Sequence, residues 1–146
     1  MSFGEVGGSI LESYASGLPY EAVGNIDTTP YVVNPGYVSP TPNGVPYFFS
    51  GRGAYRMPSI SSTDLALTVT ARVFETLDLY VQPQILNVFN QRGVLAVDTT
   101  VNTLQAFNPF TQKPVRGVNY EPAPTFGTPI EYQPPRTFRF SLGLRF

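Results

Sequence analysis

The chain has 146 residues, nine basic and ten acidic side chains, and a formal net charge of −1. It contains no cysteine and no histidine, which excludes thiol nucleophiles, imidazole bases, and thiolate or imidazole sites for zinc, copper or haem. The few charges are scattered along the chain, so we expect no nucleic-acid partner.

Only 13% of the residues are charged, against roughly 25% in an ordinary soluble domain. The chain also has 15 prolines, 13 glycines, nine tyrosines and eleven phenylalanines, a composition rich in turns and aromatic rings. No apolar run is long enough for a transmembrane helix. The first ten residues (MSFGEVGGSI) carry no basic or apolar region typical of a signal peptide.

The first predicted strand covers residues 5–16. Val6, Gly8 and Ile10 share one face of an alternating pattern, although Glu12 comes next on that face. A long proline-rich connection follows over residues 17–62.

This first connection is unusually aromatic, and its rings with nearby arginines suit recognition of sugars or organic chelates. The candidate ligand-contacting residues are Tyr31, Tyr37, Tyr47, Phe48, Phe49, Arg52, Tyr55 and Arg56. The alternative is that these rings pack the connection against itself and against its neighbours, which are also proline-rich.

Two further strands are predicted over residues 63–74 and 77–90, joined by a short turn at 75–76. Pro83 interrupts the second of them, so a bulge or local break is expected near Gln82–Gln84. A second long proline-rich connection covers residues 92–135.

The last predicted strand, residues 136–146, alternates without a fault. Its apolar side is formed by Phe138, Phe140, Leu142, Leu144 and Phe146, and its other side carries Arg139 and Arg145. Short and long connections thus alternate along an all-β chain. This is the pattern of a transmembrane barrel, in which apolar residues face lipid and polar residues face the lumen.

Several short motifs resemble the C-terminal part of TonB-dependent receptors of the kind that carries a carboxypeptidase-regulatory-like N-terminal domain. Asn87, Phe89 and Asn90 match an N-x-F-N element that closes the penultimate strand, and 135–138 (PRTF) matches the entry of the last strand. Residues 16–20 (SGLPY), 50–55 (SGRGAY) and 63–67 (TDLAL) resemble earlier elements of that family. The final phenylalanine is similar to the signal read by the barrel-assembly machinery.

The resemblance implies that residues 1–146 supply about four antiparallel strands of a large β-barrel in the outer membrane of a Gram-negative bacterium. It further implies two long extracellular connections, a periplasmic turn at 75–76, and an assembly signal in the row from Phe138 to Phe146. The expected partners are the rest of the barrel, its plug, outer-membrane lipid and the assembly machinery, with TonB reached only through a missing N-terminal part. The side chains expected to face the lumen or plug are Asp64, Arg72, Asp78, Tyr80, Gln82, Gln84, Arg139 and Arg145.

The resemblance therefore predicts a segment of a ligand-uptake receptor that does not transport alone, with no catalytic residue, cofactor or metal. Asp64 and Asp78 are poor candidates for a catalytic carboxylate pair, because they fall at opposite ends of a hairpin. One alternative is three copies sharing one barrel, which the long connections disfavour. Another is a soluble β-sandwich that binds carbohydrate or protein through its aromatic loop.

Overall fold

The computed structural model describes residues 4–33 and 44–146, and the chain is all-β over these ranges. The described residues contain no α-helix and only one short 3-10 helix, η1 (Thr29–Tyr31). Accordingly, no helix in the described ranges is long and apolar enough to cross a membrane. The all-β class predicted from the two-residue periodicity is confirmed.

The chain divides into two compact units. Unit 1 comprises Met1–Gly17, Pro58–Val94 and Tyr132–Phe146, and unit 2 comprises Leu18–Met57 and Leu95–Glu131. Unit 1 is built from the long alternating segments, whereas unit 2 is built from the two proline-rich connections.

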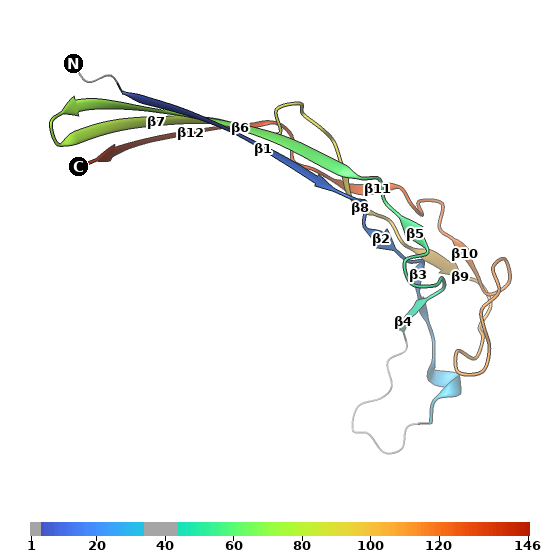
Figure 1. The fold of residues 1–146 in the computed structure, drawn as a ribbon. Helices are drawn as coiled ribbons and strands as arrows, with labels where there is room; N and C mark the ends of the chain where they lie inside the picture. The colour runs from blue at the N-terminus through green and yellow to red at the C-terminus, as the bar shows by residue number, and fades with distance from the viewer. Residues whose placement is uncertain (1–3, 34–43) are drawn as a thin grey trace. The chain divides into compact units, whose positions relative to one another are not determined.

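Unit 1 is a single four-stranded antiparallel sheet, visible in Figure 1 as four long strands side by side. Its strands are β1 (Glu5–Ala15), β6 (Ile60–Phe74), β7 (Leu77–Leu86) and β12 (Thr137–Arg145). They lie in the order β1-β6-β7-β12, which is also the order in which these four strands follow one another along the chain. Residues 75–76 form the turn between β6 and β7.

The register of this sheet aligns apolar with apolar positions across all four strands. One rung joins Val6, Val69, Val81 and Leu142, and another joins Ile10, Leu65, Ile85 and Phe138. Because side chains alternate along each strand, these rungs lie on one face and the polar rungs between them lie on the other.

The penultimate strand is shorter than the predicted range 77–90. β7 ends at Leu86, and Asn87 and Asn90 take left-handed conformations with φ of 53° and 52°. Asparagine tolerates this region better than other residues with a side chain, so the two asparagines turn the chain out of the sheet.

Pro83 breaks the ladder but produces no bulge. β7 pairs with β6 at Gln84 and again at Val81, with no pair between them. The register is the same on both sides of this gap, and on the β12 side Pro83 pairs with Phe140 without a shift. Two rungs are missing, as expected beside an interior proline that lacks an N–H, and no residue is inserted.

The two proline-rich connections form short strands in unit 2. Three short antiparallel pairs form there: β2 (Pro19–Tyr20) with β5 (Tyr55–Arg56), β3 (Val23–Ile26) with β4 (Val45–Phe48), and β9 (Val101–Thr103) with β10 (Tyr120–Pro122). A further pair is formed by β8 (Val94–Val97) and β11 (Pro129–Tyr132).

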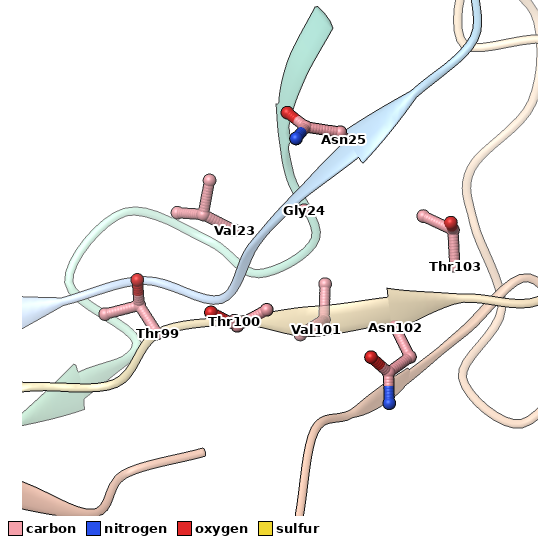
Figure 2. Close-up of a pocket in the computed structure, with 8 residues that line it drawn as sticks. All are labelled: Val23, Gly24, Asn25, Thr99, Thr100, Val101, Asn102 and Thr103. Atoms are coloured by element: carbon pink, nitrogen blue, oxygen red, sulfur yellow. The ribbon is translucent and has the colours of Figure 1, made fainter. Parts of the chain in front are cut away.

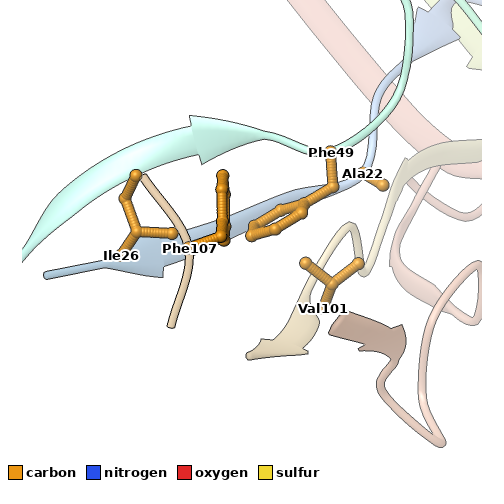
Figure 3. Close-up of a cluster of buried hydrophobic side chains, with 5 residues drawn as sticks. All are labelled: Ala22, Ile26, Phe49, Val101 and Phe107. Carbon is orange, nitrogen blue, oxygen red and sulfur yellow. The ribbon is translucent and has the colours of Figure 1, made fainter. Parts of the chain in front are cut away.

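The hydrophobic core lies in unit 2 and joins the two connections. Its buried side chains, shown in Figure 3, are Ala22, Ile26, Phe49, Val101 and Phe107. Aromatic contacts extend it, because Phe49 lies 4.6 Å from Tyr120 and Tyr55 lies 5.1 Å from Phe126, measured between ring centroids. Aromatic packing thus holds segments far apart in the chain as one unit.

Adjacent phenylalanines test this core. Phe49 is 7% exposed and Phe48 is 61% exposed, so the two side chains have opposite environments. We expect Phe49→Ala to destabilise unit 2 by about 3–5 kcal/mol and to raise amide hydrogen exchange over residues 95–131. Phe48→Ala should change the free energy of unfolding by less than about 1 kcal/mol. Equal exchange in the two variants would contradict a core that joins the connections.

Candidate functional site

One face of the unit 1 sheet is apolar and uncovered; we call it the apolar face. On the apolar side of β12 the exposed fraction falls from 72% at Phe138 to 59% at Leu144, and Phe146, just after the strand, is 98% exposed. Among the described side chains of unit 1, only that of Asn87 is buried. The apolar face consists of Val6, Gly8, Ile10, Leu65, Leu67, Val69, Ala71, Leu79, Val81, Pro83, Ile85, Phe138, Phe140, Leu142 and Leu144.

The opposite side, the polar face, carries all eight residues predicted to face a lumen or plug: Asp64, Arg72, Asp78, Tyr80, Gln82, Gln84, Arg139 and Arg145. Asp64 lies at the end of this face away from the turn at 75–76. The register therefore brings these residues onto one surface. Leu11 is an apolar exception on β1.

The polar face is organised at the end near the turn at 75–76. Arg72 Nε lies 3.2 Å from Asp78 Oδ1, and Arg145 is the cross-strand neighbour of Asp78. The Tyr80 ring lies over Gly143, leaving no room there for a side chain. An aromatic ring placed over a glycine compensates for the missing side chain on the neighbouring strand. A small hollow of about 180 Å³ lies beside this ring, lined by Thr68, Thr70, Asp78, Tyr80, Gln82 and Arg145.

At the other end of the sheet, Asn87 is the centre of a buried hydrogen-bond junction. Its side chain is 4% exposed. Nδ2 donates to the carbonyl oxygens of Gln91 and Pro134 at 2.9 Å each, and Oδ1 accepts from the Gln91 N–H at 2.8 Å. The backbone N–H of Asn87 donates to Asp64 Oδ1 at 2.8 Å. This junction ties the end of β7 to β6 and to the segment that enters β12.

Asn90 makes a second tie to the same segment. Its Oδ1 accepts from the Arg136 N–H at 2.9 Å, and Arg136 Nη1 donates to the Val88 carbonyl oxygen at 3.3 Å. The N-x-F-N and P-R elements noted in the sequence are therefore contact partners in the fold. Sequence reasoning matched these motifs but assigned no physical role to the asparagines.

Unit 2 contains an open, uncharged hollow of about 490 Å³ between β3 and β9 (Figure 2). The two strands meet where the Val23 N–H donates to the Thr99 carbonyl oxygen at 2.8 Å. Gly24 is required there, since a Cβ would lie 2.8 Å from Val101 Cγ2. The lining residues are Val23, Gly24, Asn25, Thr99, Thr100, Val101, Asn102 and Thr103. Sequence reasoning missed this hollow, although residues 98–103 (DTTVNT) are a polar run.

The predicted ligand-contacting residues have different environments in unit 2. Phe49 is in the core, with Tyr47 and Tyr55 packed against it, as in the alternative interpretation. Phe48 and Arg52 line a different hollow with Glu21 and Ser50. Tyr31 ends η1 and Arg56 pairs with Pro19 in the β2–β5 ladder, whereas Tyr37 lies outside the described residues.

Asp98 organises the turns of unit 2. Its Oδ1 accepts from the Thr100 N–H at 2.9 Å, and its Oδ2 accepts from the Thr125 hydroxyl. Hydrogen bonds from Thr100 and then Thr125 lower the pKa of the Asp98 carboxyl below 3.8. A carboxylate with a lowered pKa is a poor proton acceptor, so this network is suited to holding turns rather than to general-base chemistry. Among the described residues, no three His, Cys, Asp or Glu gather as a metal site would require.

A scan against protein-family models and searches of curated proteins and solved structures found no match to the chain.

Replacing Asn87 tests the junction. Asn87→Gly keeps the left-handed backbone but removes three side-chain hydrogen bonds, so we expect a loss of about 2–4 kcal/mol in the free energy of unfolding. Asn87→Ala should cost about 1 kcal/mol more, because alanine disfavours φ near 53°. Asn90→Gly, which removes one side-chain hydrogen bond, is the matched control and should have the smaller effect. Denaturant titration followed by circular dichroism measures all three; a neutral Asn87→Gly variant would rule out the junction as a stabilising element.

The hydrogen bonds of Asp98 predict that the stability of unit 2 falls at acid pH. Because the pKa of Asp98 is lower in the folded chain than its usual 3.8, its contribution to stability is present above that value and is lost as the pH falls through the folded pKa. Asp98→Asn should remove this part of the acid sensitivity. Carboxyl titration by NMR is expected to give a pKa below 3.8 for Asp98 and a value closer to 3.8 in Thr125→Val. An unchanged Asp98 pKa in Thr125→Val would contradict the assigned network.

Proposed function

We propose that the chain is part of the wall of a transmembrane β-barrel, and that it forms the C-terminal part of an outer-membrane TonB-dependent receptor for ligand uptake. The observation that carries this proposal is the apolar face, which extends over four strands without cover in the described residues. Water is a poor environment for a surface of this composition, whereas the hydrocarbon of a bilayer is a good one.

The dimensions of the apolar face support a membrane setting. On β12 the alternating apolar row extends from Phe138 to Phe146, just after the strand, a length of about 26 Å at ~3.3 Å per residue. A strand tilt of about 40° reduces this to about 20 Å, close to the apolar band of roughly 25 Å around outer-membrane barrels. Beyond Leu65 the next position on this face is Thr63, whose hydroxyl bonds to the Glu12 carboxylate, so the band ends in polar groups.

The connectivity supports the same proposal. Neighbouring strands are antiparallel throughout, and the outer edges of β1 and β12 have no strand beside them among the described residues. An open sheet edge is costly in lipid because its backbone groups lack partners, so further strands of the receptor would complete the wall. In this arrangement the turn at 75–76 is periplasmic and unit 2 is extracellular.

Each surface then has a proposed role. The polar face contacts the plug or lines the lumen, where Arg72, Arg139 and Arg145 remain hydrated. The row from Phe138 to Phe146 acts as the assembly signal, and unit 2 offers its hollows to ligand. The chain has no proposed catalytic activity, and it would not transport without the rest of the barrel, the plug and the TonB-binding part.

A soluble binding module is the second candidate, favoured by the separate aromatic core and open hollow of unit 2. A β-sandwich, however, packs a second sheet on the apolar face of the first. The exposed fractions along β12 therefore favour the barrel over the sandwich.

Adjacent positions on β12 discriminate between the two candidates. Arginine at a lipid-facing site near the bilayer centre costs about 2–4 kcal/mol, so Leu142→Arg should reduce recovery of the chain with floated lipid vesicles. Ser141→Arg places the same charge on the polar face and should leave recovery nearly unchanged. A monodisperse monomer in buffer without detergent, with no vesicle binding, would overturn the proposed function.

A further inference from the structure

Two arginines lie against exposed aromatic rings at one end of unit 1. Arg92 Cζ is 5.0 Å from the centre of the Tyr132 ring, and Arg136 Cζ is 6.0 Å from the centre of the Phe138 ring. All four side chains are exposed. We call these four residues the basic–aromatic stripe.

The stripe continues the apolar face beyond its end. Phe138 belongs to the rung of Ile85, the last apolar rung before the Asn87 junction, and Arg136 precedes it by two residues. Residues 90–93 run beside 133–136, since the Gln133 N–H donates to the Gly93 carbonyl oxygen at 2.8 Å. This pairing brings Arg92 and Tyr132 to the same end of the sheet as Arg136.

The two ends of the apolar face differ in charge. The end near the turn at 75–76 carries Phe74, Leu77 and Phe146 but no cation, and Glu75 is in the turn. The other arginines of the sheet, Arg72, Arg139 and Arg145, lie on the polar face. The acidic strand residues at this end are Glu131 on β11, beside Tyr132, Asp64 on β6, which accepts from the Asn87 N–H, and Glu12 on β1, which accepts a hydrogen bond from Thr63. Arg92 and Arg136 are the two arginines of unit 1 that lie outside its four strands, and both are at this end of the sheet.

We propose that the basic–aromatic stripe binds the phosphates of anionic lipid headgroups in the leaflet at this end of the sheet. The inference rests on the proposed function, because it needs the apolar face to lie in hydrocarbon. A guanidinium presents a planar fork of donors that matches phosphate oxygens, and its ring contact limits the entropy lost on binding. Tyrosine and phenylalanine rings favour the same interfacial depth.

Vesicle flotation tests the proposal with the full chain diluted from denaturant. The probes are phosphatidylcholine vesicles and vesicles that also contain phosphatidylglycerol. A basic residue near an anionic surface raises partitioning by about fivefold, so the natural chain should prefer the anionic vesicles by at least tenfold at low salt. Arg92→Gln combined with Arg136→Gln should remove this preference and leave binding to phosphatidylcholine unchanged.

The control Arg139→Gln with Arg145→Gln removes the same charge from the polar face and should keep the preference. Arg92→Lys with Arg136→Lys should retain most of it. Because Arg136 also bonds to Val88, Arg92→Gln alone is the second variant, and it should lower the preference about fivefold.

The outcomes separate this inference from the proposed function. A chain that binds neither vesicle type refutes both. Equal binding of the natural chain to both vesicle types, or loss of preference in the polar-face control, overturns the stripe and leaves the barrel proposal standing. Binding of inorganic phosphate by the detergent-solubilised chain, dependent on the same two arginines, would reassign the stripe to a soluble anion.

Discussion

The structure of unit 1 depends on one constraint, the register that aligns apolar with apolar positions across four antiparallel strands. A shift of one residue in any strand would move its apolar side chains to the polar face. The register is retained even at Pro83, where two rungs are unpaired but no residue is inserted. The result is a sheet with two chemically different faces and little side-chain burial of its own. Its stability must come largely from backbone pairing and from whatever covers the apolar face, which is why its environment is the central question for function.

The two ends of the sheet are built differently. Near the turn at 75–76, the chain reverses through two residues, and charged groups meet across the polar face. At the opposite end, buried Asn87 and its partners control the exit from β7 and the entry to β12. The second connection lies between this exit and entry, and in unit 2 its rings share one core with rings of the first connection. These proline-rich connections are ordered without long ladders, because aromatic packing and side-chain hydrogen bonds at turns, such as that of Asp98, hold them.

Much of the sheet could be predicted from alternation, because each of its strands has one apolar side and a period of two survives in sequence. The turn at 75–76 could also be predicted, because the connection between the two alternating segments is short enough for a hairpin. The end of the penultimate strand could not be predicted in the same way, since Asn87 and Asn90 leave the sheet through left-handed conformations that no periodicity reveals. For the candidate sites, alternation grouped Arg72, Asp78, Arg139 and Arg145 on one face. The environments of the aromatic residues in the first connection could not be predicted. Composition does not distinguish a ring that packs inward, such as Phe49, from its outward neighbour Phe48.

The sequence by itself determined the all-β class, the long strands and the division of their side chains between two faces, because these are local consequences of alternating residue types. Only the tertiary structure decided which residues from distant segments meet. It brought Asn87 to Pro134, Phe49 to Phe107, and Arg92 to Tyr132. It also left the apolar face without cover in the described residues. Such contacts depend on strand order and on how each connection folds back, and these are properties of the whole chain that no single segment encodes.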